Sequence, residues 1–156
     1  MIAVIQRVKN ASVIADGEPS GSCGFGLYIL LGVAKEDSEA DASALAEKIS
    51  KLRIFTDDND KMNLSALDVG AEALVVSNFT LNANYAHGNR PDYFASAAPA
   101  EANRLYEYFV ELMRGKLSRV ETGVFGADMK TSMTTDGPVT IVMDSKGLIN
   151  KGKANR

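Results

Sequence analysis

The 156-residue chain is poor in the residues that build disulfides, metal sites and catalytic dyads. It has one cysteine, one histidine and no tryptophan. A single cysteine cannot form an intrachain disulfide or a cysteine-based zinc site, and a single histidine excludes a histidine-rich metal site. We therefore expect no metal and no cofactor. The lone thiol also favours a reducing compartment, and we expect a cytoplasmic location.

Long apolar runs are also missing. No stretch approaches the roughly 18 apolar residues that suggest a membrane span. The segment Met1–Arg7 lacks the basic region and apolar core that are typical of a signal peptide. The formal net charge of −3 argues against sequence-independent binding to long nucleic acids, which needs many Lys and Arg on phosphates. This charge leaves open a local contact with a short RNA end.

The hydrophobic periodicity predicts a single α/β domain with a mixed sheet. One helix follows Ser38 and Asp41, which have capping-box spacing, and its apolar stripe runs from Ala42 to Leu52. A second helix is predicted from Pro99 to Gly115. Only some of the predicted strands alternate with helices, so a doubly wound parallel sheet does not fit. The predicted strands are 2–8, 11–14, 26–33, 73–81, 120–125, 129–134 and 139–144. The polar residues from Lys146 to Arg156 predict a loose C-terminal tail.

Two short segments carry the candidate chemistry. Ser77–Leu81 lies at the end of a predicted strand, where hydroxyls and backbone N–H groups can converge on a substrate. On its own, this pattern more often marks a strand whose hydroxyls face water or cap a turn. Asp136–Thr140 contains a Gly-Pro pair, which on its own predicts only a turn. His87 lies in a polar loop, where an exposed histidine is the simplest interpretation.

Together, these segments resemble the motifs of the D-aminoacyl-tRNA deacylases, also called D-tyrosyl-tRNA deacylases. Ser77–Leu81 is similar to the family's S-Q-x-T-L motif, and Thr135–Thr140 is similar to its N-x-G-P-V-T motif. The similarity runs from Ile2 to about Ser145. Asn78 stands where the family usually has Gln, and Thr135 where it usually has Asn. Further matching stretches are 52–55, 61–65, 88–91 and 125–129.

The resemblance implies a barrel-like mixed sheet with two main helices, a deacylase domain over residues 1–145 and a polar tail over 146–156. It implies hydrolysis of the ester bond of D-aminoacyl-tRNA, and also of mischarged glycyl-tRNA. It further implies a homodimer that binds the aminoacyl-tRNA 3′ end at the subunit interface. No membrane partner is expected.

The resemblance also implies residue roles. Gly137 and Pro138 are expected to form a cis peptide in a loop that enters the partner subunit's site and rejects L-aminoacyl groups. Arg7 and Met129 are expected to hold this loop, although Met129 fits plain core packing equally well. The remaining expected site residues are Ser77, Asn78, Phe79 and Thr80.

For the chemistry, we expect the backbone N–H groups of Phe79 and Thr80 to stabilise the developing oxyanion. A Thr80 nucleophile lacks a visible base, so we favour attack by water assisted by the terminal ribose 2′-OH. One alternative is a sister enzyme that removes L-amino acids through a trans Gly-Pro loop, although Ser77 and Phe79 favour the D-specific type. Another alternative is a dimeric module that binds RNA ends without turnover.

Overall fold

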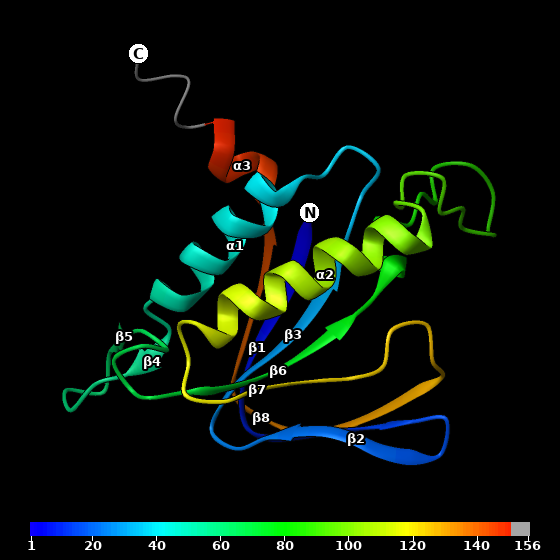
Figure 1. Cartoon of the computed structure of the whole chain (residues 1–156). Helices are drawn as coiled ribbons and strands as arrows, with labels where there is room; N and C mark the ends of the chain where they lie inside the picture. The colour runs from blue at the N-terminus through cyan, green and yellow to red at the C-terminus, as the bar shows by residue number, and fades with distance from the viewer. Residues whose placement is uncertain (151–156) are drawn as a thin grey trace.

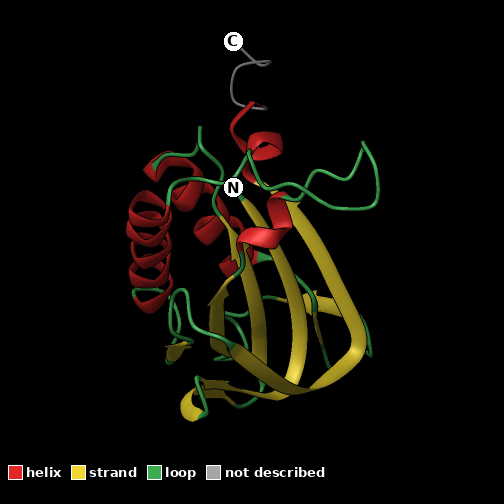
Figure 2. Ribbon diagram, turned by 90° about the vertical axis from the view of Figure 1, so that its right-hand side faces the viewer, coloured by secondary structure: helices red, strands yellow, loops and turns green. Residues whose placement is uncertain are grey.

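The structure is a computed structural model that describes residues 1–150, in which a curled mixed sheet is covered on one face by two long helices (Figure 1). This arrangement confirms the predicted α/β class with a barrel-like sheet. The curl is clearest in side view, where the strands bend around one another (Figure 2). The elements are β1 (Ile2–Ala15), β2 (Glu18–Cys23), β3 (Gly26–Gly32), α1 (Glu39–Lys51), β4 (Phe55–Thr56), β5 (Met62–Leu64), β6 (Glu72–Ser77), η1 (Phe79–Asn82), α2 (Pro99–Arg114), β7 (Val120–Thr122), β8 (Met129–Asp144) and α3 (Ser145–Ile149).

The long strand β1 organises the sheet. Its first half pairs with β3, its second half pairs with β2, and β8 runs antiparallel along nearly all of its other edge. Strands β3, β6 and β7 are parallel, so the sheet is mixed. Because β8 pairs only with β1 among the described strands, its outer edge is open.

The structure corrects several predicted boundaries. The strands predicted at 2–8 and 11–14 are one strand, and those predicted at 129–134 and 139–144 are also one. The strand Glu18–Cys23 was missed because its proline, glycine and serine residues show no apolar alternation. The strand predicted at 73–81 ends at Ser77 and continues as a 3₁₀ helix.

The prediction of a loose tail is wrong for residues 146–149. Ser145–Ile149 form the short helix α3, where the Asp144 side chain accepts a hydrogen bond from the Lys146 N–H at 3.0 Å. Local capping of this kind stabilises a polar segment without an apolar run. The rest of the predicted tail, residues 151–156, lies outside the described residues.

The two faces of the sheet have different partners. Leu27, Ile29 and Leu31 point toward α1 and α2 and belong to the main core, whereas Tyr28 packs on the opposite face in a smaller cluster. This alternation follows from the two-residue repeat of a strand. At the start of α1, the Ser38 N–H donates to the Asp41 carboxylate at 2.9 Å, as the capping-box spacing predicts. None of the helices within residues 1–150 is long and apolar enough to cross a membrane.

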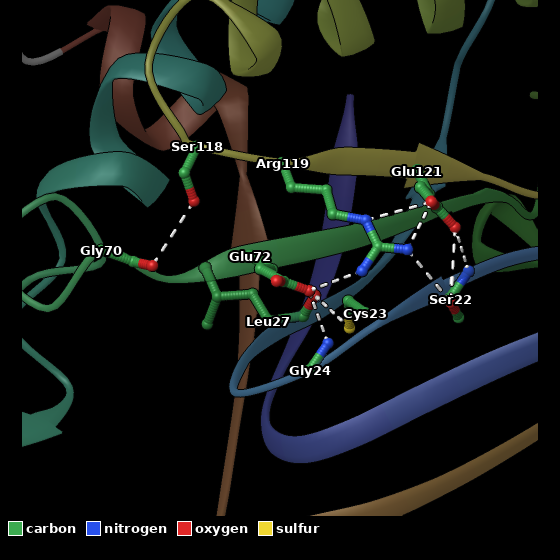
Figure 3. A network of polar contacts seen from close by, with 9 residues as sticks. All are labelled: Ser22, Cys23, Gly24, Leu27, Gly70, Glu72, Ser118, Arg119 and Glu121. Carbon is green, nitrogen blue, oxygen red and sulfur yellow. Dashed lines mark hydrogen bonds and ion pairs between the residues drawn. The ribbon is translucent and has the colours of Figure 1, made fainter.

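Side chains rather than a backbone ladder close the barrel where β2 approaches β6 and β7. Glu121 accepts from the Ser22 N–H at 2.6 Å, and Glu72 accepts from the Gly24 N–H at 2.6 Å. Arg119 lies between the two carboxylates and binds both (Figure 3). We call these three side chains the seam cluster. The two carboxylates thereby satisfy one backbone donor on β2 and one just after it, which would otherwise be free to pair with another chain.

Candidate active site

A cavity of about 810 Å³ opens beside the end of β6. Its size falls in the range of small-molecule pockets. Tyr28 and Leu30 reach it from the face of β3 that points away from the main core. The cavity lining contains five of the predicted site residues: Ser77, Asn78, Phe79, Thr80 and Met129.

The backbone turns sharply where β6 ends. Asn78 caps the 3₁₀ helix η1, and its side-chain oxygen accepts a hydrogen bond from the Thr80 N–H at 3.2 Å. The Thr80 hydroxyl binds the same oxygen. The Phe79 N–H, by contrast, makes no hydrogen bond to any of residues 1–150. Of the two expected oxyanion donors, Phe79 is therefore free, while Thr80 is engaged by the short amide of Asn78.

Several contacts hold this turn in place. The Asn78 N–H donates to the Leu31 carbonyl at 2.8 Å, and the Ser96 hydroxyl donates to the Phe79 carbonyl at 3.2 Å. The Phe79 ring meets Tyr93 edge to face at 4.9 Å between centroids. Phe79 nevertheless remains 57% exposed. The backbone donors at the cavity mouth are thus fixed before any ligand arrives, which is what electrostatic stabilisation of a transition state requires.

The cavity lining has three titratable side chains, Tyr28, Tyr93 and Asp128. Burial raises the pKa of Tyr28, whose hydroxyl donates to Thr131 at 3.3 Å, so this phenol stays protonated. The Asp128 carboxylate is largely exposed and pairs with Lys130 at 2.6 Å. His87 does not line the cavity. Within residues 1–150 there is also no group of three or more side chains of the His, Cys, Asp or Glu type arranged to hold a metal ion.

The second predicted segment bulges out of the ladder between β1 and β8. Gln6 pairs with Thr140 and Val8 pairs with Thr135, so residues 136–139 face Arg7 alone. We call residues 136–139 the Gly-Pro loop. Four residues cannot pair with one, so the loop leaves the plane of the sheet.

Arg7 ties the Gly-Pro loop to the body of the domain. Its guanidinium donates to the carbonyl of Asp136 at 3.1 Å and to that of Ile54 at 2.7 Å. It also forms an ion pair with the Asp136 carboxylate at 3.2 Å. Only 8% of Arg7 is exposed. The Gly137–Pro138 peptide is cis, and Gly137 has φ of 124°, a backbone conformation that essentially only glycine adopts.

Comparison with known proteins assigns the chain to a family. The family described as D-Tyr-tRNA(Tyr) deacylase matches residues 4–144. A D-aminoacyl-tRNA deacylase of Pelobacter propionicus is 54% identical over 92% of this chain and 99% of its own length. The enzyme of the same name from Caldicellulosiruptor bescii is 51% identical over 94% of this chain and 98% of its own. The chain belongs to the D-Tyr-tRNA(Tyr) deacylase family.

Two solved structures share the fold of this chain. The structure described as c-Myc DNA Unwinding Element Binding Protein is 37% identical to this chain, with a TM-score of 0.87 over 92% of this chain and 98% of the other. A second structure, described as a probable eukaryotic D-amino acid tRNA deacylase, is 15% identical with a TM-score of 0.80 and covers the same shares. The second likeness establishes the shared deacylase fold.

Within one chain of this deacylase family member, the predicted site residues form two groups. Gly137, Pro138 and Arg7 do not line the cavity. Met129 does, and it pairs with Ala15 at the far end of β8. Eight residues of extended strand place Met129 roughly 25 Å from Gly137 along β8. Met129 therefore does not hold the Gly-Pro loop of its own chain.

Two residues that line this cavity were not predicted from the sequence. Tyr93 packs on Phe79, and Ser96 binds the Phe79 carbonyl. Both follow the polar loop 84–92 and precede α2, in a stretch without hydrophobic periodicity. Residues 88–91 match a stretch of the family, but nothing in the spacing of the residues from Arg90 to Tyr93 indicates contact with the end of β6.

Proposed function

We propose that this protein hydrolyses the ester bond of D-aminoacyl-tRNA and releases free tRNA and the D-amino acid. The observation that carries the proposal is the identity above 50% to relatives named D-aminoacyl-tRNA deacylase over nearly their whole length. The substrate is a charged tRNA, so we place the reaction in the cytoplasm. Glycyl-tRNA is a second expected substrate.

The chemistry we propose uses backbone donors. The free Phe79 N–H points to an oxyanion site at the mouth of the cavity. The Thr80 N–H joins this site when the substrate oxygen displaces the Asn78 side-chain oxygen, or shares the N–H with it. Water attacks the ester carbonyl with help from the ribose 2′-OH of the terminal adenosine. An aminoacyl ester is already labile, so positioning supplies much of the rate. The cavity lining has no histidine, and its one carboxylate, Asp128, is paired with Lys130, which supports this scheme.

Chirality is read, in this proposal, by the main-chain carbonyls of Gly137 and Pro138. Inverting the α-carbon exchanges the side chain with hydrogen, so a rigid wall near that carbon rejects the L isomer without reading the side chain. Glycine carries no side chain and passes the same wall. The hydrogen bonds from Arg7 to the Gly-Pro loop provide the required rigidity.

We also propose a homodimer, which the separation of the two groups supports. Gly137 and Pro138 do not reach the cavity of their own chain, so in this proposal they enter the cavity of a second copy and meet its Met129. A symmetric dimer would complete both sites at once. The open edge of β8 and the exposed apolar side chain of Val142 on that strand (71%) support contact with a partner.

The decisive experiment compares D-tyrosyl-, L-tyrosyl- and glycyl-tRNA in matched reactions and scores loss of the ester. We expect rapid loss from D-tyrosyl- and glycyl-tRNA and little from L-tyrosyl-tRNA. Preferential hydrolysis of the L isomer would instead support the sister type. Binding of charged tRNA without turnover would support a nucleic-acid binding module.

A further inference from the structure

The loop of residues 84–94 projects from the domain at the end where α2 begins (Figure 1). Two of its side chains, Tyr85 and Phe94, are 80% and 78% exposed. We call this segment the aromatic loop. Single exposed apolar residues are common, but two large rings on one loop beside a candidate active site mark a surface suited to a partner.

Hydrogen bonds within the aromatic loop fix its backbone. Asn84 and Asp92 exchange backbone hydrogen bonds, each at 2.9 Å, and their side chains bond to each other at 3.0 Å. The Asp92 carboxylate also accepts from the Phe94 N–H at 3.2 Å, and the Asn84 oxygen accepts from the Ala86 N–H at 3.1 Å. The backbone that carries the rings is therefore preorganised, which lowers the entropic cost of binding.

The aromatic loop connects the candidate active site with a second cavity. That cavity measures about 530 Å³ and is lined by Leu81, Asn82, Tyr85 and Lys146. The 3₁₀ helix η1 thus begins in the first cavity and ends in the second. Four residues of 3₁₀ helix span only about 8 Å. A chain that leaves the first cavity past η1 enters the second cavity, which Tyr85 lines.

The aromatic loop presents one cation that can bind an anionic partner. Arg90 and His87 are its basic residues, and Arg90 forms no ion pair within residues 1–150. The only carboxylate of the aromatic loop, that of Asp92, accepts hydrogen bonds from the Phe94 N–H and from the Asn84 side chain. At pH 7 the loop has a formal net charge of zero, with Arg90 as its positive charge and Asp92 as its negative charge, so Arg90 is the side chain available to a phosphate.

We propose that the aromatic loop binds the single-stranded 3′ end of tRNA, at the nucleotides that precede the aminoacylated adenosine. Tyr85 and Phe94 stack on bases, and Arg90 binds a backbone phosphate. Exposed aromatic rings combined with cations are the usual means of holding single-stranded RNA. The inference rests on the proposed deacylase function, because that function places the terminal adenosine in the neighbouring cavity.

The test compares two substrates that differ only in the RNA. D-tyrosyl-tRNA carries the preceding nucleotides, and D-tyrosyl-adenosine does not. We expect Tyr85→Ala and Phe94→Ala each to raise KM for D-tyrosyl-tRNA by roughly 5- to 150-fold, the effect of losing one stacked base. Turnover of D-tyrosyl-adenosine should stay at the wild-type rate. Met62→Ala, which removes an exposed apolar side chain from β5, is the matched control and should change neither.

Salt dependence tests the phosphate contact. Arg90→Ala should reduce the slope of log Kd for uncharged tRNA against log salt by about 0.7, the value for one phosphate on a single strand. An unchanged slope would remove Arg90 from the interface.

Other outcomes would overturn the proposal as a whole. An unchanged KM for D-tyrosyl-tRNA in both aromatic variants would do so, and so would an equal loss on D-tyrosyl-adenosine. Dissociation of a dimer in either variant, seen by sedimentation, would identify a second copy of the chain as the occupant. If the wild type hydrolyses neither substrate, the deacylase function fails; Kd for uncharged tRNA then decides, and equal values in wild type and variants refute the aromatic loop as an RNA surface.

Discussion

Replacing Gly137 with alanine tests the Gly-Pro loop most directly, because both the backbone and its surroundings oppose a side chain there. At φ of 124°, the added Cβ would lie 2.9 Å from Val139 Cγ2, 3.0 Å from the Val139 nitrogen and 3.2 Å from Arg7 Nη2. The backbone strain costs about 1–3 kcal/mol. The contacts with the Val139 backbone add overpacking that the loop cannot easily relieve. We expect Gly137→Ala to lower the free energy of unfolding by about 2–4 kcal/mol.

Gly70→Ala is the matched control. Gly70 also has a positive φ, of 63°, but nothing lies within 4 Å of its Cβ position. It should cost only the left-handed backbone penalty of about 1–2 kcal/mol. The difference between the two variants in urea unfolding therefore reports the crowding at Gly137 together with any larger backbone strain at its φ of 124°.

The functional half of this prediction concerns selectivity. Alanine at 137 displaces the carbonyls of the Gly-Pro loop, so the ratio of D-tyrosyl- to L-tyrosyl-tRNA hydrolysis should fall by about tenfold or more, which corresponds to about 1.4 kcal/mol of lost discrimination. Turnover of the D isomer should change less. Equal destabilisation by the two variants would refute the steric argument. A folded Gly137→Ala protein with wild-type selectivity would refute the role of the loop in chirality.

Three further predictions test the site and the seam cluster. Thr80→Ala should keep D-tyrosyl-tRNA turnover within about tenfold of wild type, since backbone donors and not the hydroxyl carry the chemistry; near-complete loss would restore a threonine nucleophile. Deacylation should survive exhaustive chelation, and loss of activity with EDTA that added zinc restores would overturn the metal-free scheme. Hydrogen bonds from Arg119 and from the Ser22 N–H lower the pKa of Glu121. The ionised Glu121 carboxylate therefore stabilises the fold above the ordinary glutamate pKa, and this stabilisation is lost as the pH falls through and below about 4. Glu121→Gln should therefore lose less unfolding free energy than wild type between about pH 6 and pH 3, and an identical acid response would show that the Glu121 carboxylate does not contribute.

Much of the fold was predictable from local pattern. The apolar stripes of α1 and α2 and the buried run of β3 appear in the sequence as periodicities of 3.6 residues or as continuous apolar stretches, because each element must bury one face. The motif residues at Ser77–Leu81 and Thr135–Thr140 were found by resemblance to a family. Neither periodicity nor composition identified them, since short polar segments are typical of ordinary turns.

Tertiary structure decided which of those residues meet. Sequence distance does not reveal that Asn78 folds back onto the Thr80 N–H, nor that Ser96 and Tyr93 brace Phe79 from a loop 14 or more residues away. Residues 2–15 and 129–144 were each expected as two strands because their polar middles interrupt the apolar pattern. They are continuous because the two long strands satisfy each other's backbone groups across nearly their whole length. That pairing alone places Arg7 opposite the Gly-Pro loop and carries Met129 to the cavity at the far end of β8.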